Sequence, residues 1–228
     1  TNAQTSFIAS SLTNEGFVGA INRGLAISTA PTICLLNNDT RVTAGWLNKC
    51  LKALYSDPKF GIVGPLTGYS KHGCDSQHSL VLHSQLLPPH ARAWDIDKVN
   101  SEVEHLYPGR TIEMGFVAFM CAFIKREVLD AVTASDPRYK DGLDPNFKMG
   151  MWDDVDYCMT AKKLGYEMKL VIDTCIYHKG RSTFNLLEET EKLDVGLLLK
   201  SNKKYLDEKQ GLIKLPLLQK KNSMRMVH

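Results

Sequence analysis

The sequence predicts a layered α/β fold in which a mainly parallel central sheet is flanked by helices. Segments with helical spacing alternate along the chain with short apolar runs that end in turn-forming residues, which is typical of this class. These runs are too short for independent helices and fit strands that are buried in a parallel sheet. The 228 residues suffice for one sizeable core, and two full domains are not expected.

The composition excludes several classes of protein. Hydrophobic residues make up 43% and charged residues 23%, and no uninterrupted apolar segment is long enough to span a bilayer, so we expect neither a disordered nor a transmembrane chain. The net charge of +3 is small for this length, so we expect no nucleic-acid partner.

Positive charge is concentrated near the C-terminus. This pattern favours a solvated helical face, and the alternative is peripheral membrane contact through the basic C-terminal region. The basic residues are Lys200, Lys203, Lys204, Lys214, Lys220, Lys221 and Arg225.

The cysteines indicate a reducing compartment. None of the six forms a Cys-x-x-Cys pair, and most lie in apolar segments, so they are interpreted as small reduced core residues. We therefore expect a cytoplasmic location. The chain shows no secretory signal, but it begins at Thr1 rather than at a methionine, so a missing upstream segment could hide one.

The first predicted elements are the remnant of a strand at Phe7-Ile8-Ala9 and a helix over Val18 to Ser28. Apolar residues repeat at helical spacing in the second segment. Glycines in and before the helix allow close backbone approach, either to a ligand or to the sheet.

A strand is predicted over Ile33 to Leu36, and it stops abruptly at Asn37-Asn38-Asp39. Ligands of parallel sheets bind beyond the carboxyl ends of the strands, where these side chains would emerge. The residues alone leave two interpretations open. One is a metal site, and the other is an Asn-Asp turn without a ligand.

A helix that starts at Gly45-Trp46-Leu47 should present Leu47, Leu51 and Leu54 on one face and end before Asp57-Pro58. The next strand is expected over residues 60–65. Residues 68–110 include His72, His78, His83 and His90, whose spacing matches no zinc pattern, so this region is interpreted as a mobile loop region.

The second half of the chain continues the alternation. We expect a buried strand over residues 113–124 that is followed by a helix, then a turn-rich loop over residues 141–147. A helix from residue 152 is closed by Gly165, a last strand is expected over residues 169–172, and Ile176-Tyr177-His178 follows that strand closely. Residues 186–206 predict an amphipathic helix.

Acidic residues and a histidine stand at the ends of these elements. Asp153 and Asp154 begin a helix, where they could cap it and favour its dipole or act in catalysis. His178 follows a strand and is either a satisfied buried histidine or a ligand. Together with Asp39, these are the residue types expected around a hard divalent cation with an acid/base group nearby.

Taken together and in this order, the segments resemble the inverting family 2 glycosyltransferases of the GT-A fold. The similar segments are the family's glycine- and asparagine-bearing helix, its degenerate Asp-x-Asp metal motif, its acceptor strand and helix, its Glu-Asp catalytic motif and its metal histidine. Here they are Gly16 to Gly24, Leu35 to Thr40, Ala118 to Leu129, Trp152 to Asp156 and Tyr177 to Gly180. The resemblance extends from about Asn14 to Phe184, and more weakly through Asn202 to Tyr205.

The resemblance implies a Rossmann-like GT-A fold and an enzyme that transfers a sugar from a nucleoside diphosphate sugar to a glycan or another hydroxyl acceptor. Mn²⁺ or Mg²⁺ would neutralise the diphosphate leaving group. Asp39 would be the main metal ligand and His178 the second. Asn37 would contact the ribose or the water shell of the metal, with Asn38 beside it.

The same resemblance places Gly16 and Asn22 in the donor site and assigns the acid/base chemistry. Asp154 would be the general base that takes the proton of the acceptor hydroxyl, and Asp153 would orient the acceptor. Because Asp153 replaces the usual glutamate of the family, the choice of base between the two stays open. Asp156 should point elsewhere on the helix and be structural.

The resemblance also suggests how the chain is organised. Residues 1–184 would form the catalytic domain, without the N-terminal segment that grips the nucleotide base, and residues 185–228 a C-terminal helical segment with a basic tail. Two other hypotheses remain. One is a nucleotide-sugar or glycan binding module that has lost turnover, and the other is a metal-dependent nucleotidyltransferase, which the segments around residues 152–156 and 178 match poorly.

Overall fold

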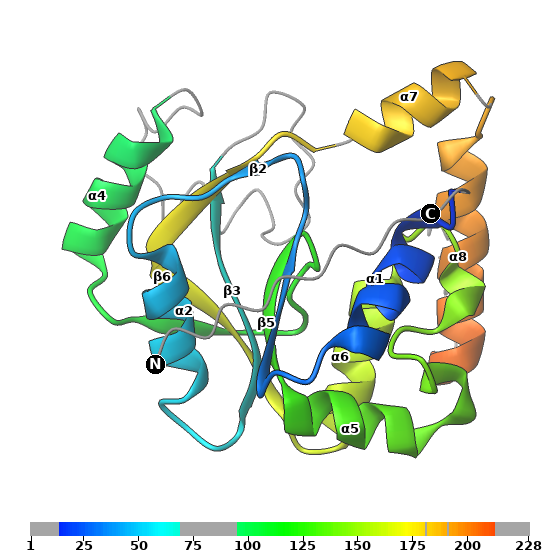
Figure 1. Ribbon diagram of the computed structural model, residues 1–228, viewed down its shortest axis with the longest axis horizontal. Coiled ribbons are helices and arrows are strands. Elements are labelled where there is room, and N and C mark those ends of the chain that lie inside the picture. The colour runs from blue at the N-terminus through cyan, green and yellow to red at the C-terminus, as the bar shows by residue number, and fades with distance from the viewer. Residues whose placement is uncertain (1–13, 69–94, 181, 191, 213–228) are drawn as a thin grey trace, which may run out of the picture.

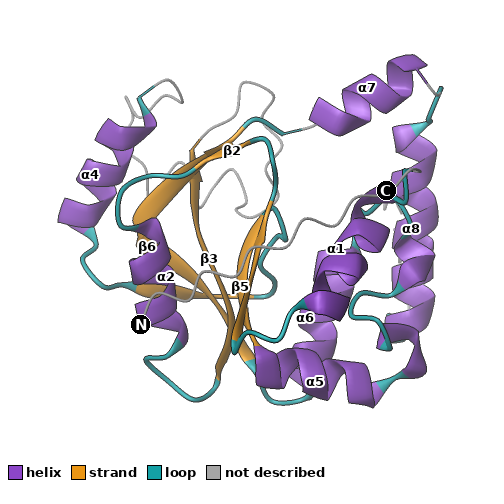
Figure 2. Cartoon of the chain, in the orientation of Figure 1, coloured by secondary structure: helices purple, strands orange, loops and turns teal. Residues whose placement is uncertain are grey.

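The computed structural model describes residues 14–68, 95–180, 182–190 and 192–212, and it has three layers (Figure 1). A central sheet separates helices α2 and α4 from helices α1, α5, α6 and α8 (Figure 2). The layered α/β class is therefore confirmed. The predicted strand remnant at residues 7–9 and the four histidines up to residue 90 lie outside the described residues.

The described strands form one sheet with the order β1-β5-β3-β6-β2, and β4 also pairs with β6. Their bounds are β1 Thr32–Leu36, β2 Thr40–Arg41, β3 Phe60–Gly68, β4 Thr111–Met114, β5 Cys121–Lys125 and β6 Glu167–His178. Among these pairings only β3 with β6 is parallel. The predicted mainly parallel sheet is wrong, because an apolar run reports burial and not the direction of the neighbouring strand.

The predicted strand at residues 33–36 exists as β1, but it is not buried on both faces. Ile33 and Leu35 are buried, whereas Cys34 and Leu36 are exposed. This alternation is typical of an antiparallel strand with one solvated face. Among the described strands, β1 pairs with β5 alone, so it forms one end of the sheet.

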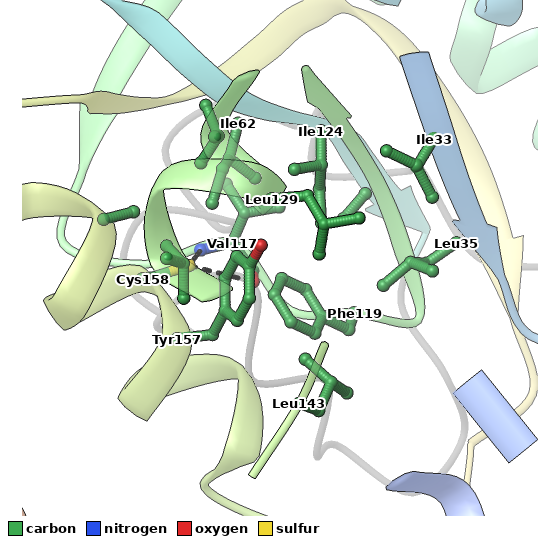
Figure 3. Packing of buried hydrophobic residues seen from close by; sticks show 14 of the residues in the cluster. Ile33, Leu35, Ile62, Val117, Phe119, Ile124, Leu129, Leu143, Tyr157 and Cys158 are labelled. Carbon is green, nitrogen blue, oxygen red and sulfur yellow. Dashed lines mark hydrogen bonds between the residues drawn. The ribbon is translucent and has the colours of Figure 1, made fainter. Parts of the chain in front are cut away.

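Four helices cover the face of the sheet that contains Ile33 and Leu35. They are α1 Gly16–Ile27, α5 Arg126–Ser135, α6 Asp153–Lys163 and α8 Val195–Gln210. Figure 3 shows the core between this face and the helices, with Phe119 and Tyr157 in edge-to-face contact at a centroid distance of 5.5 Å. The predicted helices at residues 18–28 and from residue 152 are confirmed, and Gly165 follows α6 with a φ of +94°.

Two helices cover the other face. α2 spans Trp46–Leu54 and buries Cys50 and Leu54, whereas Leu47 is 44% exposed, so the predicted shared face is wrong at Leu47. α4 spans Ile96–Leu106 inside the predicted loop region. Its buried residues Ile96, Val99 and Val103 have helical spacing, and this pattern could have predicted the helix from the sequence.

Three predicted elements differ in their extent. Residues 113–124 form the end of β4, a connecting segment and most of β5, because residues 115–120 leave the sheet. The last strand, predicted over residues 169–172, is longer and spans Glu167–His178 as β6, whose pairing with β3 shifts between Val171 and Cys175. The helix predicted over residues 186–206 is two helices, α7 Ser182–Thr190 and α8.

α8 belongs to the same core as the sheet. Leu206 is buried in the cluster that contains β1 and β5 residues, and Tyr205 packs against that cluster. The division at residue 184 stays a prediction. Lys203 and Lys204 pair with Asp207 and Glu208 along this helix, as a solvated face would. No described helix has the length and apolarity that crossing a bilayer requires.

Candidate active site

The structure brings the predicted metal motif and the predicted metal histidine together. Thr40 in β2 pairs with His178 at the end of β6, and this register places Asp39 beside the imidazole. Asp39 Oδ1 lies 3.0 Å from His178 Nε2, and the backbone N–H of Lys179 donates to the Asp39 carbonyl at 3.0 Å. Both side chains are largely buried, and the two atoms are in direct contact.

The chemistry of this pair fits a divalent cation. Two donors on neighbouring octahedral positions, each about 2.1 Å from a metal, lie about 3 Å apart. A carboxylate and an imidazole suit Mn²⁺ slightly better than Mg²⁺. Within the described ranges, no group of three or more His, Cys, Asp or Glu side chains could hold a metal. Asp39 and His178 would therefore supply two ligands, and substrate phosphates and water would complete the shell.

Asn37 joins this pair, whereas Asn38 is exposed. Asn37 Nδ2 lies 3.4 Å from His178 Nε2, and the hydroxyl of Thr40 donates to the Asn37 carbonyl at 2.7 Å. The backbone N–H of Asn37 donates to the Met120 carbonyl at 2.8 Å. These bonds fix the turn between β1 and β2 and hold the Asn37 side chain beside the imidazole nitrogen.

The two candidate catalytic carboxylates stand at the start of α6. Asp154 is half-buried and accepts from the backbone N–H of Val155 at 2.8 Å and from that of Phe119. Burial raises the pKa of Asp154 to about 6, although these backbone donors favour its charged form. A carboxyl with this pKa is mostly ionised at neutral pH and can still accept a proton readily.

Asp153 differs from its neighbour. It is only 4% exposed, and its Oδ2 atom has no hydrogen-bond partner. Burial raises the pKa of Asp153 well above its usual range, and the neighbouring charge of Asp154 raises it further. The pair therefore keeps a proton on Asp153 when Asp154 ionises, which favours Asp154 as the base.

The segment of residues 117–120 connects the two parts of the site. Met120 accepts from Asn37, while the adjacent Phe119 donates its N–H to Asp154. Val117 and Cys158 of α6 are also bonded, because the Val117 N–H donates to the Cys158 sulfur at 3.5 Å and the thiol donates to the Val117 carbonyl at 3.7 Å (Figure 3). Sequence reasoning missed this link because backbone hydrogen bonds depend little on residue type.

Gly16 and Asn22 both have packing roles. Gly16 has a φ of +72°, and a Cβ there would lie 2.8 Å from the Lys148 carbonyl oxygen. The Asn22 amide donates to the Leu143 carbonyl at 2.8 Å and accepts from the Leu143 N–H at 2.7 Å. These contacts dock α1 on the segment that leads to Asp153, and a direct donor contact by either residue stays a prediction.

We expect Asn22→Ala to lower the free energy of unfolding by about 1–3 kcal/mol, because both backbone groups of Leu143 lose their partner. Urea denaturation would measure this loss. Arg23→Ala is the matched control, since Arg23 makes an ion pair with Glu15 that is partly exposed and should contribute less than about 1 kcal/mol. A loss no larger for Asn22→Ala than for the control would contradict the packing role.

A buried ionic cluster, defined as Asp144, Asp156 and Lys209, joins α8 to α6 and to the turn that contains Asp144. Lys209 Nζ is 2.6 Å from Asp144 Oδ2 and 2.7 Å from Asp156 Oδ2, and all three side chains are nearly inaccessible. Tyr139 donates to Asp156 at 2.7 Å. The structural role expected for Asp156 is confirmed. Lys209 gave no sequence signal, because its partners lie more than fifty positions away along the chain.

Comparison with known proteins identifies the family. Residues 8–133, more than half of the chain, match the family described as Glycosyl transferase family 2. No curated protein matches. Among solved structures, the chain is similar to the crystal structure of GalNAc-T7 with UDP, GalNAc and Mn²⁺, at 13% identity and a TM-score of 0.49. The similarity covers 88% of this chain and 42% of that chain, so this chain spans less than half the length of that protein. By the family match, the chain belongs to glycosyl transferase family 2.

Proposed function

We propose that this glycosyltransferase moves a sugar from a nucleoside diphosphate sugar to an acceptor hydroxyl with inversion, using Asp154 as the general base. The observation that supports the proposal is the link through residues 119 and 120. It connects the Asp39 and His178 pair, by way of Asn37, to a carboxylate whose pKa suits a base. Mn²⁺ or Mg²⁺ between Asp39 and His178 would neutralise the charge that develops on the leaving diphosphate.

The residues of the site can also supply the proton acceptor for the reaction and a hydrogen bond to the acceptor. The acceptor oxygen attacks the anomeric carbon from the face opposite the diphosphate, the bond from that carbon to the diphosphate oxygen breaks, and the hydroxyl proton passes to Asp154. A single attack from that face inverts the anomeric configuration. Asp153, kept protonated beside Asp154, can donate a hydrogen bond to the acceptor through its carboxyl group.

The metal proposal predicts that Asp39→Asn and His178→Ala each weaken Mn²⁺ binding by roughly 10–100-fold, since each removes or weakens a ligand. Titration of Mn²⁺ by electron paramagnetic resonance, with UDP and GDP added in turn, would measure the affinity. Asp97→Asn is the control, because Asp97 is an exposed carboxylate that pairs with Arg41 of β2. Unchanged Mn²⁺ affinity in both site variants would contradict the assignment.

Transfer itself is tested with a panel of nucleoside diphosphate sugars and Mn²⁺, by measuring release of the nucleoside diphosphate and the configuration of the product. Metal-dependent binding of a nucleoside diphosphate without turnover of any donor would favour the binding module. Release of pyrophosphate would favour a nucleotidyltransferase. The division at residue 184, the cytoplasmic location and peripheral membrane contact through the C-terminal region stay predictions.

A further inference from the structure

We infer that Asn202 of α8 is a positioning residue that fixes where Asp153 and Asp154 lie. The inference rests on the proposed function, because it concerns the geometry of the proposed base. Asn202 lies on the last described helix, far along the chain from the motifs that suggested the catalytic residues. It touches neither of the two carboxylates, and it acts on the backbone segment that leads to them.

This segment, residues 148–152, has an unusual backbone conformation. Lys148, Met151 and Trp152 have φ angles of 52°, 72° and 72°, and Gly150 has a φ of 102°. Residues with a Cβ rarely adopt positive φ because the side chain crowds the following carbonyl, so the surrounding structure must hold them there. Trp152 is the N-cap of α6, and Asp153 and Asp154 are the first two residues of that helix. The conformation of the segment therefore sets the starting point of both carboxylates.

The Asn202 side chain supplies hydrogen bonds that hold this conformation. Its amide nitrogen lies 3.1 Å from the Phe147 carbonyl, 2.8 Å from that of Gly150 and 3.2 Å from that of Met151. The residue is only 6% exposed, so water does not compete effectively for these carbonyls. One amide with two hydrogens thus contacts two carbonyls of the strained segment and the carbonyl of Phe147, which directly precedes it.

Other residues attach α8 to the protein independently of Asn202. Leu206 is buried in the core, and Lys209 bonds Asp144 and Asp156. Loss of the Asn202 amide should therefore leave α8 docked and release mainly the strained segment. The Asp153 and Asp154 carboxyls would then move, and Asp154 would lose part of its burial and its bond from Phe119.

The experiment compares Asn202→Ala with Leu206→Ala, which removes a buried apolar side chain of the same helix and keeps the three Asn202 contacts to the carbonyls. For Asn202→Ala we expect kcat to fall roughly 10–100-fold with a smaller change in donor KM, as misplacement of a reacting group does. We expect the titration midpoint of Asp154, about 6 in the native protein, to move to lower pH as the carboxyl becomes hydrated. Leu206→Ala should keep the native midpoint.

A second substitution in the strained segment distinguishes a positioning role of Asn202 from a role in packing alone. Glycine adopts positive φ easily, so adding Met151→Gly to Asn202→Ala should restore a large part of kcat and the native midpoint. The midpoint is read by ¹³C NMR of the aspartate carboxyls without substrate, so it decides the inference even when no donor is turned over. If Asn202→Ala does not fold, Asn202→Ser, which keeps one donor, replaces it. A native midpoint in the variant, or an equal shift in Leu206→Ala, would overturn the inference.

Discussion

Asp154→Asn should abolish most transfer while making the protein more stable. The amide cannot take the acceptor proton, so we expect kcat/KM to fall by about 10²–10⁴-fold. Burial raises the pKa of Asp154 to about 6 from the usual aspartate value of about 3.9, so holding it ionised in the folded state costs about 3 kcal/mol above pH 6. The neutral amide removes most of this cost, and we expect a gain of about 1–3 kcal/mol in urea denaturation at pH 8.

The stability gained in Asp154→Asn depends on pH, because the folded and unfolded chains bind the Asp154 proton with different affinity. Between about pH 4 and pH 6 the folded protein binds a proton at Asp154 that the unfolded chain has already released, so native stability at this site falls as pH rises. The advantage of Asp154→Asn should therefore shrink as the pH is lowered from 8 to 4. The same titration predicts that native kcat/KM falls below about pH 6, where the base becomes protonated.

Asp153→Asn is the matched control for this prediction. Its carboxyl is held protonated by burial and by the charge of Asp154, so an amide of the same shape should preserve kcat/KM within about 10-fold. If Asp153→Asn removed transfer and Asp154→Asn kept it, the two roles would have to be exchanged. A loss of both activity and stability in Asp154→Asn would indicate misfolding and would contradict the prediction.

The sequence could predict the elements whose signals are local. The helix at residues 18–28 and the helix closed by Gly165 were found because periodicity and end signals lie within the element itself. The pairing direction of the strands could not be found, because it depends on contacts between segments far apart in the chain. The same limit explains why residues 115–120, which leave the sheet, were predicted as part of one strand.

The candidate site was likewise predictable in its residues but not in the contacts that surround them. Residue type and order sufficed to select Asp39, His178 and Asp154, and the structure places Asp39 against His178. Their chemical roles stay predictions. What the sequence could not supply is the surroundings of each group, namely the backbone donors of Phe119 and Val155 and the burial that raises the pKa of Asp154. Asn22 was expected to bind the donor, but its side chain is hydrogen-bonded to the backbone of Leu143. The sequence could not distinguish the two roles, because an amide side chain serves packing and ligand binding equally well.

Lys209→Met should destabilise the protein by about 3–5 kcal/mol. The ammonium compensates two carboxylates that are almost inaccessible, those of Asp144 and Asp156, and its removal leaves both buried without a cation. In the native protein burial acts to raise the pKa of Asp144, but the Lys209 ammonium and the donors Asn146 and Tyr205 outweigh burial and lower it. Urea denaturation at pH 7 would measure the loss.

Lys203→Met on the same helix is the control. Lys203 pairs with Asp207, but its side chain is 41% exposed, so we expect a change below about 1 kcal/mol.

A pH series adds a second measurement of the role of Lys209. The lowered pKa of Asp144 contributes stability that is present above about pH 4 and is lost as the pH falls through the folded value. In Lys209→Met this contribution is absent and the carboxylates can be relieved by protonation, so the gap between native and variant should narrow toward acidic pH. A gap that stays constant would mean that the lysine stabilises α8 through its contact with the Tyr139 ring, 3.9 Å from the ammonium, rather than through its charge pairs.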